Sequence, residues 1–251
     1  MNSPKYFLSV ALLLLAIASL VVAEEQSPSP AAAEEESGEA GGDSSVGLSE
    51  AYAKNYLIAA STLSPNKKFA VIYPKLDSEE FPEGKNYLVA LQPFTILGPL
   101  ETKYPYFQHE SHGGLSAEWS EDSSVALITE ESKWGPGDIF LAEIREGKLS
   151  RMTKLLAKLH DLLKPDYTKA TSKPEPYNDE FDFIFEEESE PICQLDGTKA
   201  VKINAEATND PKGTSKRPWT GRVKAVWDIA AAKFTEQKVT REANNAHEEN
   251  D

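Results

Sequence analysis

Residues 115–153 constrain the fold of this chain more than any other stretch. They contain four short apolar-rich segments, joined by a tight turn, a longer loop and a second tight turn. The longer loop carries Trp-Gly-Pro-Gly at 134–137, and the second turn is Arg-Glu-Gly at 145–147. Short apolar segments punctuated by such turns are typical of antiparallel strands that follow one another in space. The stretch therefore predicts a four-stranded antiparallel meander.

A second copy of this order precedes it. Residues 63–72, Leu-Ser-Pro-Asn-Lys-Lys-Phe-Ala-Val-Ile, match residues 119–128, Trp-Ser-Glu-Asp-Ser-Ser-Val-Ala-Leu-Ile, position by position. Pro and Asn in the first of these segments are residues that turns favour. We expect the long loop of this copy at 75–85, a third strand at 86–91 and a fourth at 94–97.

A third and weaker copy follows. Residues 181–185 alternate as a strand does, and residues 195–201 repeat the turn and the strand after it. Residues 222–229 and 234–240 are then expected to form a hairpin. The three turns are in register at one polar position, occupied by Asn66, Asp122 and Asp196.

One amphipathic helix is expected between the second and third copies. Its apolar residues recur at helical spacing, at Met152, Leu155, Leu156, Leu159, Leu162 and Leu163. Pro165 is expected to end it, which places the helix near 152–164. We expect the leucine stripe to pack on the sheet; binding of a partner helix is the alternative.

The middle copy resembles one repeat of the TolB-type β-propellers. The resemblance rests on 119–128, on Gly-Asp-Ile-Phe-Leu at 137–141, and on 147–153 with its Met-Thr end. About three repeats, from 40 to 240, are covered, and only the middle one is specific. The first copy has Leu63 in place of the tryptophan, and the second has Glu121 where the family usually has proline. The resemblance implies a β-rich periplasmic or secreted scaffold whose loops bind protein partners, with no catalytic residue.

These patterns predict an all-β domain over 49–241 with one inserted amphipathic helix. The sheets are expected to be antiparallel four-stranded meanders in a partial, propeller-like arrangement. Closed propellers use four to eight blades, so three copies leave open edges. Strand exchange with the N-terminal segment, the inserted helix, a twisted open sheet and pairing with a second copy of the chain are the alternatives for covering those edges.

The N-terminal residues indicate export. Lys5 precedes an apolar run at 6–22, and Ala23 offers a signal-peptidase site. We expect a signal peptide at 1–23, hence a periplasmic or secreted protein; an uncleaved membrane anchor is the alternative. Residues 24–48 are acidic and lack aromatic residues, which predicts a disordered linker, and 242–251 predict a polar tail.

Charge and cysteine content exclude several partners. The 26 basic and 41 acidic residues give a formal net charge of −15, which repels nucleic acid and anionic lipid. The single cysteine, Cys193, excludes a disulfide within one chain. A protein partner in the cell envelope is what the TolB-type resemblance implies.

Few residues suggest chemistry. His109 and His112 lie three apart beside a carboxylate, and His160 could complete a metal site, but the spacing is not that of a zinc protease. No Gly-x-Ser-x-Gly nucleophile motif occurs, so no catalytic residue and no cofactor are predicted. Trp134 and Trp219 lie in long loops next to glycine or proline and are the predicted ligand or partner contacts.

Two functional hypotheses follow. The first is an exported, non-enzymatic binding or scaffold module of the bacterial cell envelope. The alternative is a metal-binding protein or metal-dependent hydrolase that uses the loop of His109 and His112. The sequence selects neither the ligand nor the oligomeric state.

Overall fold

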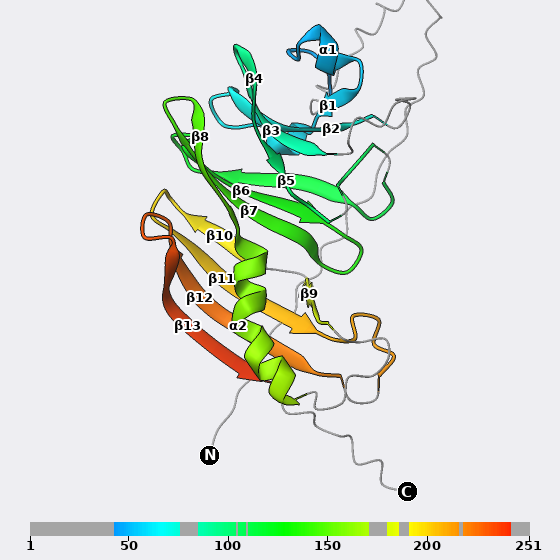
Figure 1. The fold of residues 1–251 in the computed structure, drawn as a ribbon, viewed down its shortest axis with the longest axis vertical. Coiled ribbons are helices and arrows are strands. Elements are labelled where there is room, and N and C mark those ends of the chain that lie inside the picture. Colours follow the sequence, from blue (N-terminus) through cyan, green and yellow to red (C-terminus); the bar gives the residue numbers. More distant parts are fainter. Residues whose placement is uncertain are drawn as a thin grey trace, which may run out of the picture. The chain divides into compact units, whose positions relative to one another are not determined.

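Three antiparallel sheets make up about half of the residues that the structure describes (Figure 1). The structure is a computed structural model, and it describes residues 43–75, 85–103, 105–108, 110–170, 180–185, 191–215 and 218–241. Within these residues the chain forms 13 strands and one helix that is longer than two turns. The predicted all-β class with one inserted helix is confirmed. The expected signal peptide, residues 24–42 of the expected linker, and the polar tail lie outside the described residues.

The first sheet has the strand order β1-β2-β3-β4, with each pair antiparallel. Its strands are β1 (Tyr56–Ile58), β2 (Phe69–Pro74), β3 (Asn86–Leu91) and β4 (Phe94–Leu100). The third strand has the predicted bounds, and the fourth runs three residues further than predicted. Most of the predicted long loop, 76–84, lies outside the described residues.

The second sheet is the meander that residues 115–153 predict. Its order is β5-β6-β7-β8, again antiparallel throughout. The strands are β5 (Gly114–Trp119), β6 (Val125–Glu131), β7 (Pro136–Arg145) and β8 (Lys148–Lys154).

The third sheet contains a divided edge. Its strands are β9 (Asp182–Ile184), β10 (Cys193–Asp196), β11 (Ala200–Thr208), β12 (Thr220–Asp228) and β13 (Lys233–Arg241). Both β9 and β10 pair with β11, β10 with Ala200–Ile203 and β9 with Glu206–Thr208. Two short strands therefore replace the single first strand of the other sheets, and the predicted hairpin of β12 and β13 is present.

The first two sheets each contain a turn that is closed by the same set of hydrogen bonds. The hydroxyl oxygen of Ser64 accepts a hydrogen bond from the backbone N–H of Phe69 at 3.0 Å, and Ser120 accepts one from Val125 at 2.9 Å. The next polar residue accepts the backbone N–H two positions on, at 2.9 Å for Asn66 and 3.0 Å for Asp122. These bonds satisfy donors that a tight turn would otherwise leave unpaired.

The helices are α1 (Glu50–Ala53), the 3₁₀ turn η1 (Ala60–Thr62) and α2 (Leu155–Ala170). The predicted bounds of the long helix are wrong at both ends: Met152 belongs to β8, and Pro165 lies inside α2. Proline inside a helix removes one hydrogen bond. Two residues beyond Pro165, the buried Tyr167 packs against Phe181 and Trp219, and this packing offsets the lost bond.

Successive side chains of a strand point to opposite faces of a sheet. Both faces of the second sheet are covered by other elements. On one face, Ile128 and Phe140 cluster with buried side chains of β2 and β3. On the other, Leu127 and Leu141 cluster with α2 and with β11 and β12. The buried side chains of α2 are Leu155, Leu159, Leu163 and Tyr167, so the leucine stripe packs on the sheets as predicted.

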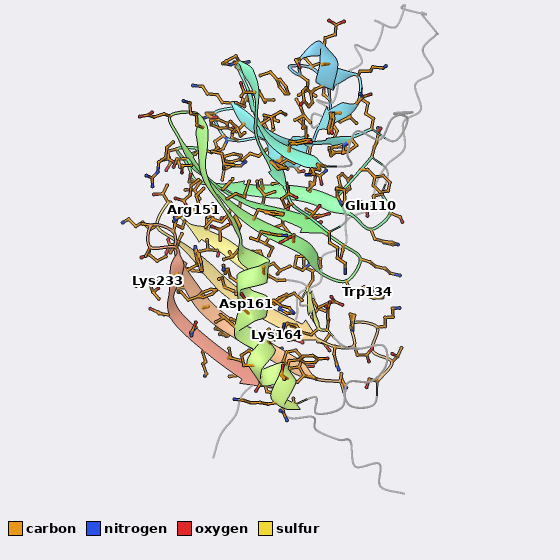
Figure 2. All side chains as sticks on the ribbon, in the orientation of Figure 1. Glu110, Trp134, Arg151, Asp161, Lys164 and Lys233 are labelled. Carbon is orange, nitrogen blue, oxygen red and sulfur yellow. The ribbon has the colours of Figure 1, made fainter. Side chains whose placement is uncertain are left out.

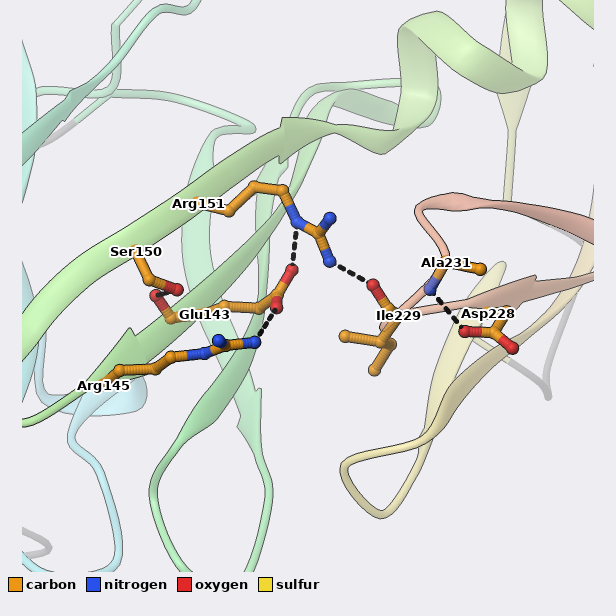
Figure 3. Close-up of polar contacts among 7 residues, drawn as sticks. All are labelled: Glu143, Arg145, Ser150, Arg151, Asp228, Ile229 and Ala231. Carbon is orange, nitrogen blue, oxygen red and sulfur yellow. Dashed lines mark hydrogen bonds and ion pairs between the residues drawn. The ribbon is translucent and has the colours of Figure 1, made fainter.

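A buried ion pair connects the second sheet to the hairpin of the third (Figure 3). Glu143 in β7 is 5 % exposed, and its carboxylate pairs with the guanidinium of Arg151 in β8. The same guanidinium donates a hydrogen bond to the carbonyl oxygen of Ile229, in the turn between β12 and β13. A buried carboxylate needs such a partner, and here the partner also fixes the hairpin.

Candidate functional site

A cavity of about 520 Å³ lies at one end of the second sheet. The loop between β6 and β7, the first half of α2, and β9 with its flanking residues line it, together with Lys103 and Glu110 from the segment that precedes β5. Figure 2 labels Trp134 and Glu110 on this part of the molecule. Its size is within the range of pockets that hold small molecules.

Two buried carboxyl groups stand side by side in this cavity. Glu130 of β6 and Asp138 of β7 are register partners and are 6 % and 7 % exposed. Directly opposed residues of an antiparallel pair share one face of the sheet. The two carboxyl groups therefore continue the row formed by Ile128 and Phe140, where a strand pattern would place apolar side chains.

Lys154 pairs with one of the two. Its ammonium nitrogen lies 3.1 Å from a carboxylate oxygen of Asp138 and donates a hydrogen bond to the carbonyl oxygen of Glu101. Burial raises the pKa of Asp138, while the bond and the charge of Lys154 oppose that rise. Asp138 is thus the partnered member of the pair.

Glu130 is the member without a partner. No hydrogen bond or ion pair to its carboxyl group occurs among the described residues. Burial, followed by the charges of Asp138 and Glu110, raises the pKa of Glu130 to about 8, against a smaller opposite effect of Lys154. At neutral pH this side chain is mostly protonated, and a cation that binds beside it displaces the proton into solvent.

Aromatic side chains form another part of the wall. Trp134 is 42 % exposed, and the ammonium of Lys133 lies 4.7 Å from its ring centroid. The ring of Phe181 stacks on His160 of α2, with 4.4 Å between centroids. The cavity thus combines acidic groups with apolar surface.

Gly135 positions β9 against this wall. A Cβ atom at Gly135 would lie 1.9 Å from the carbonyl oxygen of Phe183, so only glycine permits the contact. The amide of Phe185 also donates to the carbonyl oxygen of Trp134 at 3.3 Å. The Trp-Gly-Pro-Gly loop is therefore the support on which β9 rests.

We expect Gly135→Ala to lower the free energy of unfolding by about 1–3 kcal/mol, because the backbone of β9 must move to admit a methyl group. Urea denaturation measures the change. The matched control is Gly137→Ala, where a Cβ atom would meet nothing closer than 3.7 Å. Equal stability of the two variants would show that β9 does not rest on Gly135.

Of the two predicted tryptophan contacts, only Trp134 lines the cavity. Trp219 is 5 % exposed, and its indole N–H donates to a carboxylate oxygen of Asp166 at 3.2 Å. Trp219 lies in the predicted loop, between β11 and β12, but its ring fills the core between α2 and the third sheet.

The predicted metal ligands do not form a site among the described residues. No group of three or more His, Cys, Asp and Glu side chains is placed there to hold a metal ion. His112 is exposed, His160 lines the cavity, and His109 lies outside the described residues. A metal site that includes His109 stays a prediction.

Two further predictions concern Cys193 and the membrane. Cys193 is free and buried, and burial raises the pKa of its thiol, which agrees with the absence of a disulfide. Among the residues with described structure, no helix has the length and apolar character to cross a membrane. The apolar run at 6–22 is outside that part of the chain.

No protein-family model matches this chain, and no curated protein sequence does.

The sequence reading missed Glu130 and Asp138. A signal existed: both are charged residues in strands of a sheet predicted to be apolar, and such side chains are rarely buried without a function or a partner. The sequence did not reveal that both faces of this sheet are covered, and without that fact an acidic residue in a strand is read as exposed.

Proposed function

We propose that this chain is an exported, non-enzymatic binding module of the bacterial cell envelope, and that the cavity beside β6, β7 and α2 is its ligand site. One observation carries the proposal: Glu130, a residue that is 6 % exposed, lines the cavity, and its carboxyl group has no partner among the described residues. An unpartnered buried carboxyl group lowers stability, and a ligand that satisfies it restores that free energy.

The composition of the wall supports binding. Trp134 presents an exposed ring at the rim, and aromatic rings at such places supply contact area at little entropic cost. The resemblance of 119–153 to a TolB-type repeat agrees with a scaffold whose loops contact a partner. The run at 6–22 and Ala23 support export.

Photo-cross-linking in the producing cells tests the proposal. A benzophenone side chain placed at position 134 is expected to form one specific adduct in the envelope fraction. The same group at Lys148, which is exposed in β8 beside the β7–β8 turn, is the matched control and is expected to form none. The protein from that fraction is expected to begin at Glu24, as its intact mass will show.

Filling the cavity supplies the second control. Ala157 lines the cavity and is exposed, so Ala157→Trp occupies the space without disturbing the core. The adduct at position 134 is expected to disappear in that variant. An adduct that persists, or one that forms equally from position 148, contradicts a ligand site in the cavity; an uncleaved N-terminus contradicts export of a mature chain.

A further inference from the structure

The cavity wall carries many more acidic than basic side chains. Two lysines face six acidic residues, which are Glu110, Glu130, Glu131, Asp138, Glu180 and Asp182. Low-dielectric walls of one sign concentrate ions of the opposite sign. The cavity therefore favours cations over anions.

The protein itself neutralises only part of this charge. Lys154 is engaged by Asp138 at 3.1 Å and by the carbonyl oxygen of Glu101. Glu131 accepts a hydrogen bond from the hydroxyl of Ser116 at 3.2 Å. The carboxyl group of Glu130 has no such contact among the described residues, although the residue as a whole is more than nine-tenths buried. A positively charged ligand would supply the partner that the carboxyl group of Glu130 lacks.

The apolar part of the wall defines the rest of the ligand. Trp134, Phe181 and Phe183 line the same cavity, with Leu156 and Ala157 of α2. The contact of Lys133 with the Trp134 ring, at 4.7 Å, shows that this ring face accepts an ammonium group. A bare metal ion would leave these surfaces without contacts, whereas an organic cation covers them.

We propose that the cavity binds an organic cation, an ammonium or guanidinium group on an apolar body, with the carboxylate of Glu130 as its counter-ion and Trp134 beside the apolar part. This inference rests on the proposed function, because it names the chemical class of the ligand of that same site. A charge-assisted hydrogen bond to a carboxylate is the strongest single contact that such a site offers.

Proton release is a signature of this arrangement. Glu130 must lose its proton to pair with a cation, so affinity is expected to rise with pH until the carboxyl is ionised in the free protein. The charged groups that act on Glu130 are Asp138, Glu110 and Lys154, and His160 also faces the cavity. If Glu130→Gln abolishes the dependence of affinity on pH, the group that titrates is Glu130 rather than one of these neighbours.

Isothermal titration of the full protein with phenethylamine tests the proposal, with the uncharged phenethyl alcohol as the matched ligand. We expect the amine to bind at least about tenfold more tightly than the alcohol. Its affinity is expected to increase about tenfold between pH 6 and pH 7. Glu130→Gln is expected to weaken binding at least about tenfold at pH 8 and to remove the dependence of affinity on pH. Glu121→Gln, in the exposed turn between β5 and β6 and outside the cavity lining, is the control and is expected to change affinity less than about threefold.

Equal binding of amine and alcohol, or binding that Glu130→Gln leaves unchanged, overturns the assignment of a cation at Glu130. Absence of amine binding together with a persistent, Ala157→Trp-sensitive adduct at position 134 overturns the cation class and leaves the binding module standing. Absence of both overturns the proposed function as well.

Discussion

Glu130→Gln is expected to raise the free energy of unfolding by up to about 4 kcal/mol at pH 8 and to leave it nearly unchanged at pH 4. The pKa of Glu130 rises from an ordinary value of 4.5 in the unfolded chain to about 8 in the folded one. Between these values the folded state holds a proton that the unfolded state has lost. The stability of the unsubstituted protein therefore falls as pH increases through this window, by at most about 1.4 kcal/mol per pH unit for this group.

Urea denaturation at pH 4, 5, 6, 7 and 8 measures this profile. The difference between Glu130→Gln and the unsubstituted protein isolates Glu130 from Asp138, whose pKa is also raised. Glu131→Gln is the matched control, since Glu131 is the next residue of the same strand and is exposed. Parallel profiles for the unsubstituted protein and Glu130→Gln would mean that the carboxyl group titrates normally and is not buried without a partner.

Leu159→Ala is expected to lower the free energy of unfolding by about 2–5 kcal/mol. Leu159 is fully buried in the cluster that joins α2 to the second and third sheets. Its removal leaves a void that the strands on either side cannot fill without leaving their registers. Urea denaturation at pH 7 measures the loss.

The control for this change lies one residue away. Lys158 is exposed on the same turn of α2, so Lys158→Ala keeps the helix propensity and removes no core contact. We expect it to change stability by less than about 0.5 kcal/mol. If Leu159→Ala lowers the free energy of unfolding by less than about 1 kcal/mol, α2 is only loosely packed on the sheets. In that case α2 cannot serve as a fixed wall of the cavity.

Strand positions followed from local sequence because alternation and turn chemistry act over a few residues. The paired turns illustrate this: Ser64 with Asn66 and Ser120 with Asp122 close two hairpins through the same bonds. The C-terminal end of α2 was not predictable from local sequence. Pro165 is a stop signal by propensity, yet the packing of Tyr167 against Phe181 and Trp219 extends the helix beyond it.

The candidate site depended on tertiary structure more strongly. Trp134 was predictable as an exposed side chain, because a tryptophan between polar and glycine residues in a loop tends to be exposed. Trp219 has a similar neighbourhood and is buried, because residues far away in the chain, in α2 and at Phe181, close over it.

By itself, the sequence determined the all-β class, the four-stranded meander of 114–154, the single inserted helix and the absence of a disulfide, since each depends on local periodicity or on composition. Only the tertiary structure decided that the second sheet is covered on both faces, and hence that Glu130 and Asp138 are buried. The physical reason is that the pKa and the partners of a carboxyl group depend on the elements that pack around it. Those elements are separated from β6 and β7 along the chain and are brought together by burial of apolar surface.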